Sequence, residues 1–380
     1  MDFPSVGDAI TYRVFGETCA AYFLNPDTAP YNCYNGIRPV GIMIFQALPF
    51  LFTSDPVKAD YISLFLNILC LIVIIKSVVV IFRNLNDSME GKQHKTEKLL
   101  ETGLVILTAL LCTAYIPVRS SDIQSLAFFV SSIAIVSNKN HGQHFGMLIL
   151  AGVLAGISVL LKQNYVASIF FLVFFWVISD FRNLLENRFK RIFGFLLGSS
   201  VCLVQVAFVF HNSAEGTLWF YEPKYMETYA EGNAQPYVEL IAFSKPVPGA
   251  YLTTLQERVS TLDFIAIRFY EGVSKFYWTM YANYAPTDDE PVNLFMSAAR
   301  ILFIKLMIFL SLAGCLATYC FKNKWLFIIS VTALASGIMT ASIMHTENRY
   351  YVMTKLLYAL VAVAAVNLLM KKNGLNKNEQ

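Results

Sequence analysis

The sequence predicts an all-α protein, a polytopic transmembrane helix bundle of about nine spans that forms a single integral membrane domain over residues 1–380. The composition supports this prediction. Hydrophobic residues make up 56% of the chain, charged residues make up only 14%, and the mean hydropathy is +0.52. Because soluble domains carry about 25% charged residues, this composition excludes a cytosolic enzyme, a coiled coil, a collagen and a disordered chain.

Long apolar runs give the positions of the expected helices. A helix needs about 20 apolar residues to cross a bilayer, with about 17 as the lower limit. By this rule the expected spans are 60–82, 99–115, 121–136, 145–160, 164–179, 191–210, 301–320, 325–343 and 351–370. The run 39–52 is too short to span. It begins at Pro39 and ends at a turn that contains Asp55 and Pro56, which favours an interfacial or re-entrant helix.

Lysine and arginine predict the orientation. With nine spans, most basic residues fall in loops on one side, which is then the cytoplasm. The chain divides into an external segment with an interfacial helix (1–59), a first group of spans (60–210), a long external loop (211–300), C-terminal spans (301–370) and a cytoplasmic tail (371–380). The short loops favour a bacterial inner membrane. An odd number of spans with an external N-terminus and no signal peptide leads us to expect a further span before the first residue.

Two pairs of residues have predicted structural roles. Cys19 and Cys33 lie in the polar external segment, where they are able to form a disulfide if that segment faces an oxidising compartment. Gly152 and Gly156 have the small-xxx-small spacing of closely packed membrane helices. The glycine pair predicts packing and carries no information about chemistry.

Charged side chains from distant parts of the chain fall at the outer ends of the expected spans. They are Arg38, Arg119, Asp122, Lys162, Glu347, Arg349 and Lys355. A charge at the bilayer centre costs about 2.5–3.5 kcal/mol on insertion scales. Each of these charges therefore needs a reason for its position. For Arg119 and Arg349 there are two interpretations: they anchor span ends in the headgroup zone, or they bind an anion. Lys162 lies on the side that the positive-inside bias disfavours, and Lys355 needs a partner such as Glu347 or a bound phosphate.

No metal site and no cofactor are predicted. His345 lies next but one to Glu347, but no second histidine follows at ligand spacing. The acidic run 288–290 fits a solvated turn better than a metal site. Asp8 is a lone external aspartate of a kind that is usually only solvated, and its interest comes from Tyr12, four residues later.

Five patches match motifs of one enzyme superfamily. Residues 7–12 (GDAITY) are similar to a first external loop with its aspartate, and 35–45 (NGIRPVGIMIF) to an RPPxYP entry to a juxtamembrane helix. Residues 119–129 (RSSDIQSLAFF) are similar to the acidic start of a later span, 152–163 (GVLAGISVLLKQ) to a GLALLTK element, and 345–350 (HTENRY) to an E-x-RY motif. On these patches the sequence resembles the GT-C membrane glycosyltransferases, especially the branch of protein mannosyltransferases and lipid A aminoarabinose transferase.

The resemblance implies a transferase that takes a sugar from a polyprenyl-phosphate donor on the extracytoplasmic face. Carried over by position, Asp8 would be the general base and Asp122 a second carboxylate that orients the substrates. Lys162 and Arg349 would bind the lipid phosphate, because fixed cations stabilise the charge that grows on a leaving phosphate. The remaining residues assigned to phosphate or substrate binding are Arg38, Arg119, Glu347, Tyr350 and Lys355.

Two hypotheses from other classes stay open. A transporter or flippase for a lipid-linked or anionic substrate places its ionisable groups near the midplane, whereas these charges lie at span ends. A non-catalytic assembly subunit that keeps the fold but not the reaction fits the sequence too. The expected partners of the transferase are membrane lipids, the polyprenyl-phosphate donor and an acceptor that is a glycan, a lipid or a protein.

Overall fold

The structure, a computed structural model, describes most of the chain in eight stretches, with isolated residues between them. The stretches are 8–27, 38–86, 95–113, 119–138, 144–180, 189–213, 323–343 and 352–372. Every regular element in these stretches is a helix, and none of them contains a strand. For this part of the chain the predicted all-α class is confirmed.

The helices follow the expected spans. In chain order they are α1 (Asp8–Leu24), α2 (Val40–Phe52), α3 (Pro56–Leu85), α4 (Lys95–Thr113), α5 (Asp122–Ser137), α6 (Phe145–Leu161), α7 (Tyr165–Asp180), α8 (Phe189–Ser199), η4 (Ser200–Cys202), α9 (Leu203–Asn212), α14 (Lys324–Ile343) and α15 (Val352–Lys372). A helix lies at each expected span except 301–320, which is outside the described residues. The 3₁₀ turn η4 joins α8 and α9 into one run.

Length and composition separate these helices into two groups. Within the described residues, three helical runs are long and apolar enough to cross a membrane, namely Pro56–Leu85, Phe189–Asn212 and Val352–Lys371. Shorter apolar helices are Val40–Phe52, Asp122–Ser137, Phe145–Leu161, Tyr165–Asp180 and Lys324–Thr340. The chain is therefore a helical membrane protein, and the count of nine spans stays a prediction.

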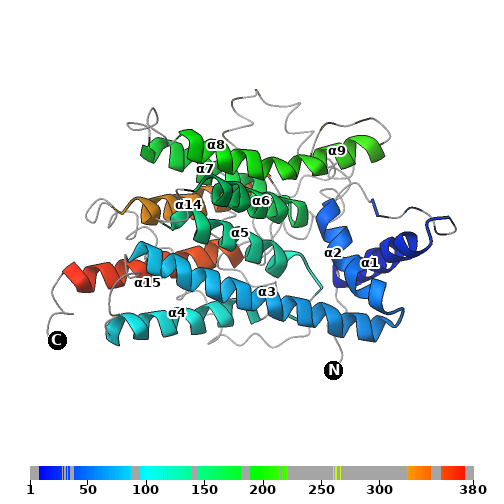
Figure 1. Cartoon of the computed structure of the whole chain (residues 1–380), viewed down its shortest axis with the longest axis horizontal. Helices are drawn as coiled ribbons and strands as arrows, with labels where there is room; N and C mark the ends of the chain where they lie inside the picture. The colour runs from blue at the N-terminus through cyan, green and yellow to red at the C-terminus, as the bar shows by residue number, and fades with distance from the viewer. Residues whose placement is uncertain are drawn as a thin grey trace.

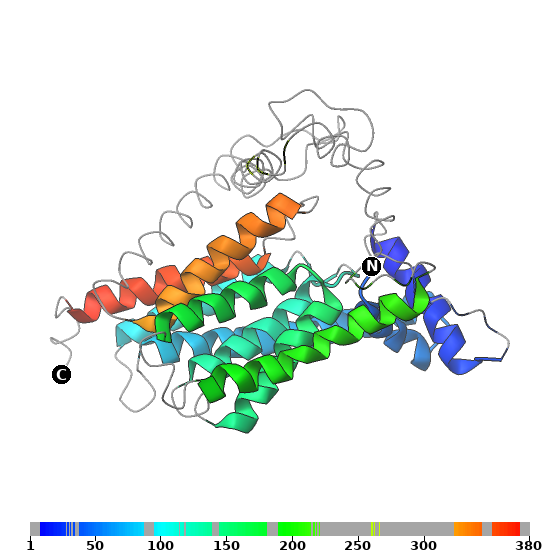
Figure 2. The same ribbon diagram turned by 90° about the horizontal axis from the view of Figure 1, so that it is seen from above.

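Several helices run along the long axis of the molecule. Figure 1 shows α3, α4, α15 and the α8–α9 run lying along the longest dimension of the molecule. Figure 2 shows the same molecule from above, with its longest dimension again horizontal. In both views α1 and α2 lie at one end and the last turns of α15 lie at the other. We call these the α2 end and the C-terminal end. Helices α1 and α2 of the predicted external segment and the end of α15, where the predicted cytoplasmic tail begins, are thus at opposite ends, while the side that faces the cytoplasm stays a prediction.

Helix α1 is an element that the sequence did not predict. The segment 1–59 was expected to contain one interfacial helix, and it contains both α1 and α2. The two pack backbone to backbone, since a Cβ atom on Gly16 would lie 2.4 Å from the carbonyl oxygen of Gln46. The sequence of α1 mixes Arg13, Glu17 and Thr18 with apolar residues, so it lacks the long apolar run by which the other helices were recognised.

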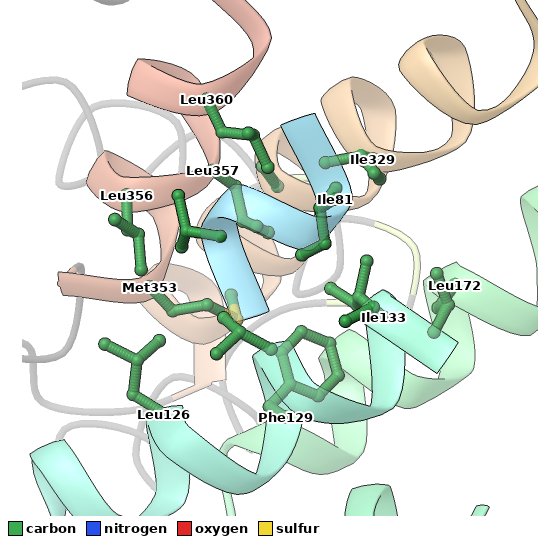
Figure 3. Packing of buried hydrophobic residues seen from close by; sticks show 14 of the residues in the cluster. Ile81, Leu126, Phe129, Ile133, Leu172, Ile329, Met353, Leu356, Leu357 and Leu360 are labelled. Carbon is green, nitrogen blue, oxygen red and sulfur yellow. The ribbon is translucent and has the colours of Figure 1, made fainter. Parts of the chain in front are cut away.

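The core lies between helices that are distant in sequence. Figure 3 shows side chains of α3, α5, α7, α14 and α15 directed toward one another. Helix α15 contributes most, because nearly all of its first half is buried. Polar pairs add to this packing: Gln124 of α5 donates to Asn67 of α3 at 2.5 Å, and the hydroxyls of Ser77 and Ser131 lie 3.0 Å apart. Such polar contacts hold membrane helices together where the hydrophobic effect is weak.

Glycines bring α6 and α8 into direct backbone contact. A Cβ atom on Gly152 would lie 2.0 Å from the carbonyl oxygen of Phe195, and one on Gly198 would lie 2.0 Å from that of Ile149. Gly156 is also close to its neighbours, since such an atom would lie 2.4 Å from the Val201 side chain and 2.9 Å from the carbonyl oxygen of Ser199. The packing role predicted for Gly152 and Gly156 is confirmed.

Ion pairs tie the helices together at the C-terminal end. Arg83 of α3 donates twice to Glu101 of α4, at 2.9 and 2.7 Å. Asp180, the buried last residue of α7, pairs with Lys324 of α14 and accepts from Trp176 Nε1 at 3.1 Å. These cations have carboxylate partners, so they serve the fold at this end.

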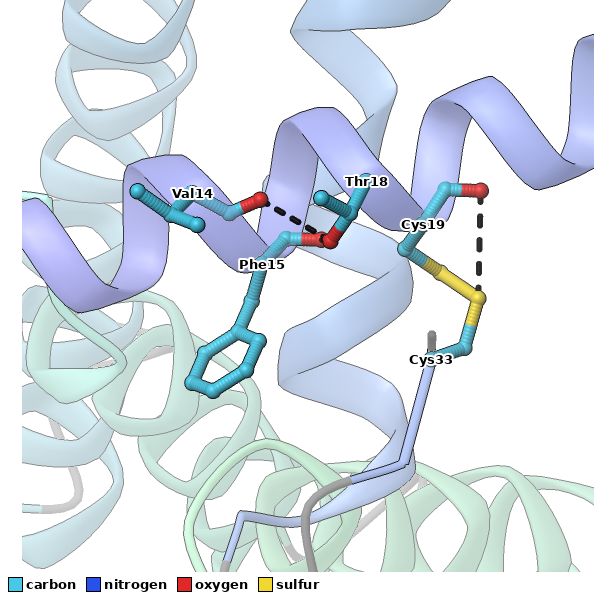
Figure 4. Close-up of a disulfide and its surroundings, with 5 residues drawn as sticks. All are labelled: Val14, Phe15, Thr18, Cys19 and Cys33. Atoms are coloured by element: carbon cyan, nitrogen blue, oxygen red, sulfur yellow. Dashed lines mark hydrogen bonds between the residues drawn. A yellow bond between two sulfur atoms is a disulfide. The ribbon is translucent and has the colours of Figure 1, made fainter. Parts of the chain in front are cut away.

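A disulfide fastens α1 to the segment before α2. Cys19 and Cys33, the pair singled out from the sequence, are bonded to each other, and both are buried (Figure 4). We expect the double replacement Cys19→Ser and Cys33→Ser to lower the free energy of unfolding by about 3 kcal/mol, because a bridge that closes a loop of this length restricts the unfolded chain by about that much. Thermal unfolding of the purified protein in detergent measures the effect.

Treatment of the wild type and of the double variant with a reducing agent is the control for this prediction. It is expected to lower the unfolding temperature of the wild type to that of the double variant and to leave the variant unchanged. If complete reduction of the wild type, verified by thiol labelling, leaves its unfolding temperature unchanged, the bridge does not stabilise the fold.

Candidate functional site

Asp122 begins α5 at the α2 end, and the residues before it are held in place. Gln46 of α2 donates to the carbonyl oxygen of Ser120 at 3.3 Å, and Ser125 Oγ donates to that of Ser121 at 2.6 Å. The backbone N–H of Asp122 donates to Ser120 Oγ at 3.4 Å. Asp122 is only 2% exposed, so its carboxylate is both fixed and desolvated.

Lys162 is the partner of this carboxylate. It follows the last residue of α6, where its N–H donates to Ser158 at 2.9 Å, and it begins the predicted short turn to α7. Its Nζ pairs with Asp122 Oδ1, and its side chain is 12% exposed. The structure thus brings together two predicted site residues that are 40 positions apart in sequence.

Helix α2 lies against the same end of α6. A Cβ atom on Gly41 would lie 2.6 Å from the carbonyl oxygen of Leu160, so the start of α2 and the segment that carries Arg38 lie beside the end of α6. Arg38 donates to the hydroxyl of Tyr12 at 3.0 Å, and its guanidinium carbon lies 4.9 Å from the centre of that ring. The motif residue Arg38 is therefore placed at the α2 end near Lys162.

A second ion cluster joins α1, α3 and the loop before α5. Asp60 accepts from Arg119 Nε at 2.6 Å and from an Arg13 terminal nitrogen at 2.5 Å. Arg119 also lies over the Phe50 ring, 4.9 Å from its centre. Burial lowers the pKa of the Arg119 guanidinium from its usual value, and the hydrogen bond to Asp60 opposes this shift.

Two members of that cluster were missed in the sequence. Arg13 and Asp60 belong to none of the quoted motifs. A signal for Asp60 existed, because a carboxylate in the first turns of an apolar span is costly and usually has a partner. Its partner Arg13 had no such signal, since the helix that carries it was not predicted.

Lys355 lies at the same end in a buried position. It belongs to the first turn of α15 and is 9% exposed. Ser168 of α7 donates to Met353 Sδ at 3.5 Å, so the start of α15 lies beside the start of α7. Helix α7 begins three residues after Lys162. The expected partner of Lys355, Glu347, lies outside the described residues, as do Arg349 and Tyr350.

The structure describes only some of the residues on which the predictions for Asp8 and for metal binding depend. Asp8 is the first residue of α1, but its side chain is not among those described. Within the described residues, no group of three His, Cys, Asp or Glu side chains is arranged to hold a metal ion. The acidic run 288–290 and His345 lie outside them.

Comparisons by sequence and by structure give different results. No protein-family model matches the chain, and no curated protein matches it by sequence. Two solved structures resemble it in fold. The first is the Archaeoglobus fulgidus oligosaccharyltransferase in complex with zinc and sulfate, with a TM-score of 0.56 and 13% identity. The match covers 97% of this chain and 46% of that chain.

The second is the oligosaccharyltransferase AglB of Archaeoglobus fulgidus, in complex with an inhibitory peptide and a dolichol-phosphate. Its TM-score is 0.52 at 14% identity, and the match covers 98% of this chain and 47% of that chain. The chain thus spans a little under half the length of these structures. Identities of 13% and 14% show a shared fold and do not single out a branch of an enzyme superfamily. The chain therefore shares its helical fold with the matched part of these oligosaccharyltransferases.

Proposed function

We propose that the chain is a membrane glycosyltransferase that transfers a sugar from a polyprenyl-phosphate donor to an acceptor at the α2 end. The observation that carries the proposal is the Asp122–Lys162 pair, a buried carboxylate and a cation held together where α5 begins and α6 ends. Arg38, Arg119 and Lys355 lie at the same end and add positive charge. The fold supports the proposal, because a resembling structure, AglB, was solved with a dolichol-phosphate.

The paired state of Lys162 suggests how the donor is received. A lipid phosphate that enters the site competes with Asp122 for the ammonium group, since both are anions. Lys162 and Arg349 then bind the phosphate, with Glu347 and the remaining motif residues around it. Fixed cations stabilise the negative charge that develops on a leaving phosphate.

The proposed reaction needs two carboxylates. Asp8 accepts the proton of the acceptor while the acceptor atom bonds to the anomeric carbon of the sugar. The bond between that carbon and the phosphate oxygen breaks, and polyprenyl phosphate leaves. Asp122, released from Lys162, orients the acceptor or the sugar. A positioned base of this kind contributes about 10²–10⁴-fold to a rate.

Finer features of the proposal follow from the sequence motifs. The branch with protein mannosyltransferases and lipid A aminoarabinose transferase suggests transfer of one hexose or pentose. The donor is bound on the extracytoplasmic face of a bacterial inner membrane, and the C-terminus lies in the cytoplasm. The acceptor is a glycan, a lipid or a protein.

Native mass spectrometry of the protein in mild detergent tests the proposal. We expect the wild type to retain a polyprenyl phosphate or its glycosylated form, and we expect the double variant Lys162→Ala and Arg349→Ala to lose it. Ordinary phospholipid alone in both samples would remove the main support and favour the transporter or the assembly subunit. A variant with Lys58→Ala, an exposed cation near the α2 end, is the matched control and should retain the lipid.

A further inference from the structure

The guanidinium of Arg119 is bonded on one edge only. Its Nε donates to Asp60, its plane lies over Phe50, and the residue is 5% exposed. Its Nη1 and Nη2 atoms are shielded from solvent, and neither has a hydrogen-bond partner among the residues that the structure describes. A buried donor without an acceptor costs about 1–3 kcal/mol, and more when it is charged. A guanidinium held in this way is well suited to take an acceptor from a ligand.

The charges of the cluster point to the same conclusion. Asp60 is shared by Arg13 and Arg119, so one carboxylate faces two cations. The Arg13 side chain is 32% exposed and forms the solvent-facing edge of the cluster, with Arg119 behind it. Desolvated cations need a counter-charge, and an anion that arrives from the α2 end meets Arg13 first.

We propose that the Arg13–Asp60–Arg119 cluster binds one oxyanion, with two of its oxygens accepting hydrogen bonds from Nη1 and Nη2 of Arg119. The planar guanidinium matches the spacing of two oxygens in a carboxylate or a phosphate group. Asp60 occupies the Nε edge and so directs the other two nitrogens toward the ligand. In this arrangement Asp60 is a positioning residue, and Arg119 is the group that touches the ligand.

The identity of the oxyanion rests on the proposed function. Arg119 precedes Asp122 by three residues, so their Cα atoms are at most about 11 Å apart, and one donor head group is able to contact both. The oxyanion is then a second anionic group of the donor, in addition to the phosphate at Lys162. It is either the second phosphoryl group of a lipid diphosphate or the carboxylate of an acidic sugar.

Thermal unfolding of the full chain in detergent, titrated with inorganic phosphate at constant ionic strength, tests the site. Phosphate is expected to raise the unfolding temperature of the wild type. Arg119→Lys keeps the charge but loses the planar fork, and it should weaken the apparent phosphate affinity by about tenfold. Arg83→Lys is the matched control, because Arg83 makes a two-pronged bond to Glu101 at the C-terminal end. It should leave the affinity unchanged.

Two possible results would overturn the oxyanion site, and a third would separate it from the proposed function. Equal phosphate affinity of the wild type and Arg119→Lys would overturn the proposal. Loss of the phosphate effect in Lys162→Ala alone would also overturn it, while supporting the donor site at Lys162. A weakened affinity in Arg119→Lys, in a protein that retains no polyprenyl lipid, would support the oxyanion site and contradict the glycosyltransferase.

A second variant and two further ligands extend the test. If Arg119→Lys does not fold, Asp60→Asn provides a second test, because its amide oxygen still accepts from Arg119 Nε and keeps the guanidinium in position, while the negative charge that repels an anion is removed. Its unfolding temperature should rise more with phosphate than that of the wild type, and an equal or smaller rise would count against the site. Titrations with pyrophosphate and with glucuronate separate the ligands: both Arg119→Lys and Lys162→Ala weaken binding of a bridging pyrophosphate, whereas only Arg119→Lys weakens binding of glucuronate.

Discussion

Replacement of Asp122 with Asn is expected to lower the rate of sugar transfer by about 10²–10³-fold. The side chain keeps its size but loses its charge, so it no longer attracts Lys162 or a developing positive charge on the sugar. Binding of the donor lipid should persist, because the phosphate then has Lys162 without a competing carboxylate. Initial rates with the lipid donor found by native mass spectrometry measure the effect.

A control variant and a double variant accompany this experiment. Asp27 is an exposed aspartate at the same end of the molecule, and Asp27→Asn should transfer at the wild-type rate. Because Asp122 and Lys162 are in contact, the losses caused by Asp122→Asn and Lys162→Ala should not add in the double variant. A wild-type rate in Asp122→Asn would exclude this carboxylate from the reaction.

Replacement of Gly152 with Ala is expected to cost about 3 kcal/mol of stability or more. The new methyl group would lie 2.0 Å from the Phe195 carbonyl oxygen, and a backbone atom cannot rotate away as a flexible side chain can. Helices α6 and α8 must therefore separate, which loosens the part of α6 that ends at Lys162. The unfolding temperature in detergent and the yield of folded protein measure the loss.

Gly103 gives a control with the opposite expected sign. It lies within α4, and a Cβ atom there would meet nothing within 4 Å. Gly103→Ala should therefore stabilise the helix by about 0.5–1 kcal/mol, since alanine is the better helix former. If both variants shift the unfolding temperature by the same amount, close contact between α6 and α8 is not what makes Gly152 necessary.

The sequence predicted those parts of the fold that depend on one segment at a time. Helices α3, α14 and α15 were located because each contains a long apolar run, and the glycine contact of α6 was expected from its spacing. Asp122 and Lys162 were each predicted as site residues, but their pairing depends on how α5 and α6 pack, which no local pattern specifies. Arg119 was expected to bind an anion or to anchor a span end.

The parts that were missed depend on contacts between segments. The Asp60 cluster needs α1, α3 and the loop before α5 to meet, and α1 itself has a mixed composition that conceals its helix. Its stability comes from tertiary contacts, namely the disulfide and the close approach of Gly16 to α2. Contacts of this kind override local propensity, so they are visible only in the folded chain.

The joining of α1 to α2 has a mechanical consequence. The disulfide joins α1 to the segment before α2, and a backbone contact joins the two helices directly, so they are expected to move as one rigid body. That body carries Tyr12, which holds Arg38, together with Arg13 and Phe50, which hold the Asp60 cluster. A tilt of this body would loosen the surroundings of Arg38 and of Arg119 in a single motion, so the two groups of cations would become accessible together.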